Sequence, residues 1–204
     1  MRVLHDHYFK KAKQQNYPAR SVFKLAEIQA KHRFIKAGDK VVDLGCHPGS
    51  WTLFASETAG ANGMVVGVDL KQTEHLPRPG GAPIHWLCHD IMDDTLVDEL
   101  HTISPRFKVL LSDLAPKTTG NRWADHQQSM RLVRRTVALA ERVLVPSGHY
   151  LGKLFQGEET ESFIKELRGI FAQVKVIKPD SSRKQSREVY ALALRYSPNS
   201  TGNR

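Results

Sequence analysis

The chain has 204 residues, a length typical of one domain, and 40% of them are apolar, enough for a hydrophobic core and too many for a disordered chain. No apolar run reaches the ~18 residues of a membrane helix or forms a signal-peptide core, and with only Cys46 and Cys88 a disulfide scaffold is excluded. The formal net charge of +9 makes nucleic acid the first candidate partner. We therefore expect a soluble, cytoplasmic, basic domain.

The predicted elements begin with a short basic stretch over residues 8–15 and a helix over residues 22–31, which Ser21 is expected to cap. Apolar runs bounded by turn residues then predict seven strands, at residues 40–45, 64–69, 84–90, 107–113, 150–155, 174–177 and 188–196. Helical patterns lie between most of these strands, at residues 51–58, 95–101, 125–144 and 159–171.

This alternation predicts an α/β fold in which helices cover both faces of a mostly parallel, seven-stranded sheet. No helix precedes the last strand, so we expect that strand to be antiparallel. We expect a single domain over residues 1–196 and a flexible tail over residues 197–204.

Aspartates stand at the carboxyl ends of four successive predicted strands; they are Asp43, Asp69, Asp90 and Asp113. Ligands of an open parallel sheet bind at these ends. One such residue would have little meaning, but four in succession indicate a binding site and not mere solvation.

The loop after the first of these aspartates contains Gly45, Pro48 and Gly49 and leads into a predicted helix. Glycines let a ligand approach the backbone, and a helix N-terminus offers free N–H groups. The loop lacks the third glycine of the dinucleotide fingerprint and has carboxylates around it, which disfavours a dehydrogenase. Asp69 is placed to bind ribose hydroxyls and Asp90 to receive an adenine amino group, requirements that S-adenosylmethionine meets.

Five stretches carry a resemblance to a known family; they are residues 19–25 (ARSVFKL), 42–51 (VDLGCHPGSW), 112–116 (SDLAP), 152–157 (GKLFQG) and 178–190 (KPDSSRKQSREVY). On them the chain resembles the FtsJ-type ribosomal RNA large-subunit 2′-O-methyltransferase family, from about residue 6 to residue 196. It departs from the family pattern at Cys46 and His47, where small residues are usual, at Ser50, where a second glycine is usual, and in the loop 117–120.

The resemblance implies a Rossmann-like S-adenosylmethionine-dependent methyltransferase fold, with S-adenosyl-L-methionine as cofactor and no metal. The implied substrate is a uridine in the A-loop of 23S rRNA, presented on the assembled large ribosomal subunit to a monomeric enzyme. The implied catalytic tetrad is Lys24, Asp113, Lys153 and Glu188. The cofactor contacts implied by the resemblance are Gly49, Trp51, Asp69, Asp90 and Asp113. The glycine loop adds Asp43, Gly45 and Pro48 as further candidate contacts.

The tetrad suits methyl transfer to a ribose, because a 2′-hydroxyl has to lose its proton as the methyl group moves. Positioning supplies much of the rate of an in-line displacement, and a base at the hydroxyl adds about 10²–10⁴-fold. A lysine with the ordinary pKa of ~10.4 is protonated at pH 7, so Lys153 is a base only if burial or the charge of Lys24 lowers that pKa. Alternatively, a charged Lys153 orients the hydroxyl and stabilises the developing alkoxide. Asp113 and Glu188 would orient Lys153.

Charge is unevenly distributed along the chain. Residues 1–40 carry a net +7, residues 41–111 a net −5 and residues 112–204 a net +7, which separates an acidic cofactor segment from two basic ends. We expect residues 1–36 to form a basic extension and helix that contribute to the RNA face. The candidate RNA-binding residues are Lys10, Lys11, Lys13, Arg20, Arg183, Lys184 and Arg187, and a second candidate patch is Arg131, Arg134 and Arg135.

Two other functions are open on the sequence: a tRNA or cap ribose 2′-O-methyltransferase with the same tetrad, and a non-catalytic RNA-binding ribosome-assembly factor. The intact tetrad argues against the second, because a protein that only binds RNA has no need of all four residues. The run 85–90 superficially resembles a metal cluster, but strand alternation divides its side chains between two faces and no second half of a zinc motif follows. We expect its histidines to be structural.

Overall fold

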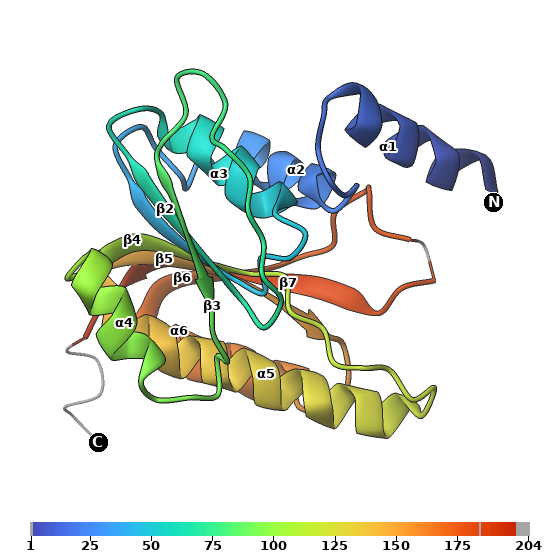
Figure 1. Ribbon diagram of the computed structural model, residues 1–204. Helices are drawn as coiled ribbons and strands as arrows, with labels where there is room; N and C mark the ends of the chain where they lie inside the picture. The colour runs from blue at the N-terminus through green and yellow to red at the C-terminus, as the bar shows by residue number, and fades with distance from the viewer. Residues whose placement is uncertain (1, 184, 199–204) are drawn as a thin grey trace.

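The computed structural model describes residues 2–183 and 185–198. A seven-stranded sheet forms its centre, in the order β3-β2-β1-β4-β5-β7-β6 (Figure 1). The strands are β1 (Lys40–Leu44), β2 (Met64–Asp69), β3 (Ile84–Cys88), β4 (Phe107–Ser112), β5 (Leu144–Phe155), β6 (Phe171–Ile177) and β7 (Glu188–Tyr196). The helices of the described residues are α1 (Arg2–Gln14), α2 (Val22–His32), α3 (Ser50–Ala59), α4 (Leu96–Ile103), α5 (Arg122–Val143) and α6 (Thr160–Ile170).

Parallel pairing joins the first five strands of the sheet, while β7 runs antiparallel between β5 and β6. This confirms the predicted mostly parallel sheet with an antiparallel last strand. The chain passes from β1 to β2 on one side of β1 and later places β4 on the other side. The strand order therefore reverses at β1, and the carboxyl end of that strand is where open α/β sheets bind ligands.

Helices cover both faces of the sheet (Figure 1). Buried side chains of α4, α5 and α6 form one core with one face, and those of α2 and α3 form a second core with the other. Successive residues of a central strand divide between the two cores: Val42 belongs to the first and Val41 to the second. Because both faces of these strands are buried, they read in the sequence as continuous apolar runs.

The predicted strands at 64–69 and 188–196 coincide with β2 and β7, and the predicted helices correspond to α2 to α6 within a few residues. The two largest differences between prediction and structure are at α1 and β5, which are both longer than predicted. Residues 8–15 lie mainly in α1, a helix that the polar composition of the stretch did not indicate. Strand β5 begins at Leu144, directly after α5. Its first residues, including Pro146, pair irregularly with β4, and regular pairing resumes at His149.

Ser21 does not cap α2 with its side chain, so this prediction is wrong. Its φ and ψ of −57° and −22° are helical, whereas a capping side chain needs the extended backbone of an N-cap residue. Its carbonyl oxygen instead accepts a hydrogen bond of 2.9 Å from the indole N–H of Trp51. Ser21 thus links the start of α2 to α3.

Within the described residues, no helix has both the length and the apolar character needed to cross a membrane. The predicted domain boundaries at residues 36 and 196 stay predictions. Residues 199–204 of the predicted tail lie outside the described residues.

Candidate active site

The structure brings the four tetrad candidates together from four elements. Lys24 lies on α2, Asp113 directly after β4, Lys153 on β5 and Glu188 at the start of β7. The Nζ of Lys24 donates to Glu188 Oε2 at 2.8 Å. The Nζ of Lys153 donates to the Asp113 carbonyl oxygen at 2.6 Å and lies 3.1 Å from Asp113 Oδ1. Both lysines are buried.

Tyr190 joins the two ion pairs, and sequence reasoning missed it. Its hydroxyl donates to Asp113 Oδ1 at 2.6 Å, and its ring centre lies 5.8 Å from the Nζ of Lys24. Because Tyr190 follows Glu188 by two positions on a strand, both side chains lie on one face of the sheet, and this spacing is the signal that could have revealed it. Burial and the neighbouring Asp113 raise the pKa of Tyr190, so its hydroxyl stays a donor.

The charges of the two lysines favour the ionised form of Glu188. Burial alone would raise the pKa of its carboxyl, but the charge and hydrogen bond of Lys24, with a further contribution from Lys153, lower that pKa below its ordinary value. Lys153 donates one hydrogen bond to the Asp113 carbonyl oxygen and forms an ion pair with the Asp113 carboxylate. Because an ammonium group has three donor hydrogens, Lys153 in that form has donor capacity left for a ligand.

The loop between β1 and α3 needs its glycines for conformation and for space. Gly45 and Gly49 have φ of 78° and 103°, in the left-handed region that side chains disfavour. A Cβ on Gly45 would lie 2.6 Å from Cγ of Leu114, and one on Gly49 would lie 2.7 Å from the His75 ring. The first glycine therefore lets the loop pack directly on the residue that follows Asp113.

A cleft of about 570 Å³ opens beside this loop, at the carboxyl ends of β1, β2 and β4. Three of the predicted cofactor residues, Gly45, Asp69 and Asp90, line it. Much of the remaining lining is apolar, which suits a ligand with a flat ring system and a few polar groups. The apolar lining residues are Leu70, Ile91, Met92, Leu114, Ala115, Pro116 and Leu132.

Asp69 and Asp90 are both held by backbone N–H groups. The two oxygens of Asp69 accept from His47 at 3.0 Å and from Lys71 at 2.9 Å, and Asp90 Oδ1 accepts from Met92 at 2.8 Å. A carboxylate has about four lone-pair positions, so each side chain can accept further hydrogen bonds from a ligand in the cleft.

The other predicted cofactor residues do not line this cleft. Asp43 is fully buried; its Oδ2 accepts from the Thr52 hydroxyl at 2.7 Å, and its Oδ1 has no partner among the described residues. Trp51 is buried with its ring 5.7 Å from that of Tyr190, so it packs beneath the tetrad. Pro48 and Gly49 lie at the start of α3, where the Pro48 carbonyl oxygen is 2.8 Å from His75 Nε2.

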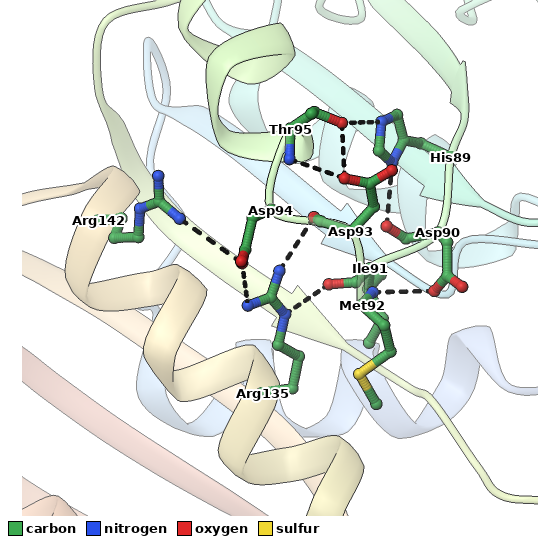
Figure 2. A network of polar contacts seen from close by, with 9 residues as sticks. All are labelled: His89, Asp90, Ile91, Met92, Asp93, Asp94, Thr95, Arg135 and Arg142. Atoms are coloured by element: carbon green, nitrogen blue, oxygen red, sulfur yellow. Dashed lines mark hydrogen bonds and ion pairs between the residues drawn. The ribbon is translucent and has the colours of Figure 1, made fainter.

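The segment from Asp90 to Thr95 is braced against α5, as Figure 2 shows. Arg135 donates to the carbonyl oxygens of Ile91 and Asp93 at 2.6 and 3.0 Å and pairs with Asp94 at 2.8 Å. This network fixes the wall of the cleft that carries Asp90. His89 belongs to the same network, and no group of three or more potential metal ligands occurs among the described residues.

Arg135 is therefore engaged in structure, and Arg134 likewise pairs with Glu159 at 2.6 Å and Glu166 at 3.3 Å. Two of the three members of the second patch predicted for RNA are thus held in ion pairs within the protein, and the patch itself stays a prediction. Arg131, the third member, lines the cleft.

The main candidates for RNA contact lie in two places. Lys10, Lys11 and Lys13 are exposed on α1. Arg20 is nearer the tetrad: burial and the charge of Arg183 lower the pKa of its guanidinium, whereas Glu188 acts in the opposite direction. Arg187 precedes Glu188 and donates to the Arg122 carbonyl oxygen at 3.3 Å. Lys184 lies outside the described residues.

At two of the positions where the chain departs from the family pattern, the residue present makes a hydrogen bond to another segment. The backbone N–H of His47 donates to Asp69, and the hydroxyl of Ser50 accepts from the backbone N–H of Ala19 at 2.7 Å. Cys46 is buried, as expected of a small packing residue. Ser50 therefore ties the segment that leads into α2, and with it Lys24, to the cofactor loop.

Comparisons with known proteins agree over most of the chain. The family model of FtsJ-like methyltransferases matches residues 17–196. Ribosomal RNA large subunit methyltransferase E of Desulfotalea psychrophila is 51% identical over 196 residues, which cover 96% of this chain and 98% of the relative. The protein of the same name from Syntrophobacter fumaroxidans is 45% identical, over 95% of this chain and 96% of its own. A crystal structure of a ribosomal RNA methyltransferase from Plasmodium falciparum superposes with a TM-score of 0.77 at 27% identity, covering 88% of this chain and 98% of that one.

Proposed function

The chain belongs to the FtsJ-like methyltransferase family, and from this premise we propose that it transfers a methyl group from S-adenosylmethionine to the 2′-hydroxyl of a ribose in large-subunit ribosomal RNA. The observation that carries the proposal is the pair of buried lysine–carboxylate contacts around Tyr190, which lie next to a cleft lined by Asp69 and Asp90. The relatives named as large-subunit ribosomal RNA methyltransferases support the substrate class.

The residues of the cleft fit the proposed cofactor, which supplies an electrophilic methyl group on a positively charged sulfur. Asp69 ends β2 and has lone pairs left for the two ribose hydroxyls. Asp90 follows β3 and is placed to accept from the adenine amino group, with Ile91 and Leu114 offering apolar contact. Asp43 is buried with Oδ1 unpartnered among the described residues, and in its ionised form it adds negative potential behind the loop, which favours a cation in front of it.

In this proposal Lys153 acts at the 2′-hydroxyl of the RNA. Two roles are open for it. If Lys153 is a neutral amine, it takes the hydroxyl proton; if it is an ammonium, it donates a hydrogen bond to the developing alkoxide. Asp113 orients Lys153 through two contacts and is itself held by the Tyr190 hydroxyl. Lys24, paired with Glu188, adds positive charge on the side from which the RNA phosphates approach.

The finer substrate that we propose is a uridine in the A-loop of 23S rRNA, presented on the assembled large subunit to a cytoplasmic, monomeric enzyme. Arg20, Arg183 and Arg187 lie near Glu188 and suit the phosphates beside the target nucleotide, while the α1 lysines suit phosphates farther along the RNA. A tRNA or cap ribose is the alternative substrate. A non-catalytic assembly factor is disfavoured, because such a protein has no use for two lysines buried with acidic partners.

The test of this function is transfer of a labelled methyl group to naked large-subunit rRNA, to isolated large subunits that lack the modification, and to tRNA. We expect label on a ribose 2′-oxygen of the large-subunit rRNA. Label on a base would contradict the proposed chemistry, label on tRNA alone would favour the alternative substrate, and no transfer to any RNA would favour the non-catalytic alternative.

Replacing Asp69 with alanine is expected to raise the dissociation constant for S-adenosylmethionine by about 10- to 150-fold, the range for losing a hydrogen bond to a charged group. The loop also loses the acceptor for the N–H groups of His47 and Lys71. Isothermal titration calorimetry with the cofactor measures the effect. The matched control is Asp98→Ala, an exposed aspartate on α4, which should leave the dissociation constant unchanged. An unchanged constant in a folded Asp69→Ala variant would remove Asp69 from the cofactor site.

A further inference from the structure

The three tryptophans of the chain occupy different environments. Trp51 is buried against Tyr190, and Trp86 packs edge-on to the His75 ring and donates its indole N–H to the His75 carbonyl oxygen. Trp123, in contrast, is 63% exposed. Among the residues that the structure describes, none makes a ring contact or hydrogen bond with its indole. A single exposed apolar side chain is common on protein surfaces, but tryptophan is enriched where proteins bind partners, so the backbone support and the charges around Trp123 decide whether it forms part of a binding surface.

The backbone that carries Trp123 is anchored on both sides. Asn121 Oδ1 accepts from the N–H of Trp123 at 3.0 Å, and Asp125 accepts from the backbone N–H and the hydroxyl of Thr119 at 2.7 and 2.9 Å. These contacts fix the first turn of α5 to the loop that comes from Asp113. The exposed ring is therefore presented from a defined position and not from a loose loop.

That position lies beside the tetrad. The Arg122 carbonyl oxygen accepts from Arg187, whose neighbour in the chain is Glu188. The side chain of Arg187 thus links the first turn of α5, which carries Trp123, to the start of β7, which carries Glu188. In Figure 1 the start of α5 lies at the same end of the molecule as the loop that leads into β7.

The charges around Trp123 narrow the class of its partner. Lys117 and Arg122 are exposed on the loop and the helix turn beside it, and Arg187 lies against the same turn. A positively charged groove with an aromatic platform is how proteins hold single-stranded nucleic acid, in which bases stack on the ring and phosphates meet the cations. An apolar protein surface would gain nothing from the surrounding cations.

We propose that Trp123 stacks on an unpaired base of the RNA substrate next to the target ribose and positions that ribose at Lys153. The proposal rests on the proposed function and names a contact within it. Stacking on an aromatic side chain is tolerant of base identity, so Trp123 contributes affinity and placement, while the tetrad carries the chemistry.

Trp123→Ala is expected to raise KM for large-subunit rRNA by about 5- to 150-fold, the range reported for loss of one stacked base, with kcat at saturating RNA and the cofactor dissociation constant unchanged. Trp123→Phe keeps an aromatic face and should retain most of the affinity. Trp123→Leu keeps apolar bulk without an aromatic face and should resemble alanine. Val176→Ala is the control for surface substitution and should behave as wild type, because Val176 is an exposed apolar residue on β6 that pairs with Ala191 and so lies on the opposite face of the sheet from Tyr190.

Tryptophan fluorescence supplies a readout that does not need turnover. Adding naked rRNA in the presence of S-adenosylhomocysteine should quench the emission of the exposed Trp123, and Trp123→Phe should abolish that quenching. If the wild-type enzyme is active and Trp123→Ala has the same KM for rRNA, or Trp123→Leu has the same KM as wild type, the role of Trp123 is overturned and the proposed function is not. Absence of quenching by naked rRNA that the wild-type chain methylates would also overturn it; if the wild-type chain methylates only the large subunit, the unmodified large subunit replaces naked rRNA in this test. A wild-type chain that transfers no methyl group to any RNA would overturn the proposed function and this role with it.

Discussion

Replacing Lys153 with alanine is expected to lower the rate of methyl transfer by about 10²–10⁴-fold, the contribution of a base or oriented donor at the reacting hydroxyl. The Nζ of Lys153 makes both of its polar contacts with Asp113, and Lys153 does not line the cleft assigned to the cofactor. The cofactor dissociation constant should therefore stay at the wild-type value. Single-turnover transfer to rRNA and calorimetric titration of the cofactor measure the two quantities separately.

The control for Lys153→Ala is Lys108→Ala. Lys108 lies on the neighbouring strand β4 and donates to the Ser147 carbonyl oxygen, away from the tetrad. Lys153→Arg separates the two roles left open for the lysine, because arginine keeps the positive charge and cannot act as a base. Transfer retained by Lys153→Arg would assign the orienting role, and transfer lost in both variants would assign the base. Wild-type turnover in Lys153→Ala would remove the residue from the mechanism.

Asp43→Asn is expected to raise the free energy of unfolding at pH 8 by about 4 kcal/mol, from 1.36 kcal/mol per pKa unit. Burial raises the pKa of Asp43 from 3.8 to about 7; the Thr52 hydrogen bond opposes the increase, and the charges of Asp113 and Asp69 add to it. Below pH 3.8 the carboxyl is neutral in both the folded and the unfolded chain. Between pH 3.8 and 7 only the unfolded chain ionises, so stability falls as pH rises, and above pH 7 the full cost is present.

The gain in Asp43→Asn should therefore be largest at pH 8 and nearly absent at pH 4. Urea unfolding at the two pH values measures it, with the exposed Asp98→Asn as a control that should show no such dependence. A gain of equal size at both pH values would show that the buried charge is not its cause. In our proposal the same variant binds the cationic cofactor more weakly. Asp43 would thus lower the stability of the folded chain and strengthen cofactor binding.

The main architecture was predictable because hydrophobic pattern and topology are coupled. Apolar runs such as Met64–Asp69 are buried on both faces, and such runs occur in parallel sheets whose carboxyl ends meet at one edge. This is why aspartates far apart in the sequence, such as Asp69 and Asp90, could be expected at one cleft, and the structure brings them there. The proximity of the tetrad residues came instead from the family resemblance.

The hydrophobic pattern of the sequence could not predict the contacts that depend on how distant elements pack together. The periodicity of β7 places Tyr190 on the same face as Glu188, but it does not indicate that the Tyr190 hydroxyl reaches Asp113, because that hydrogen bond depends on how β4, β5 and β7 are packed together. The ion pairs that occupy Arg134 and Arg135 depend in the same way on acidic residues from distant elements. The helical conformation of residues 8–14 was likewise hidden, because few apolar side chains of α1 are needed to hold it against Phe23.

The insertion of β7 between β5 and β6 has a consequence for how the protein is made. Strand β7 begins 33 residues after β5 ends, an interval of about 2–7 s of translation at typical rates. Until then the nascent chain holds β5 with an unpaired edge, the kind of edge that invites pairing with other chains. Glu188 and Tyr190 arrive on that same late strand. One strand, β7, thus both pairs with the open edge of β5 and brings Glu188 and Tyr190 to the proposed tetrad.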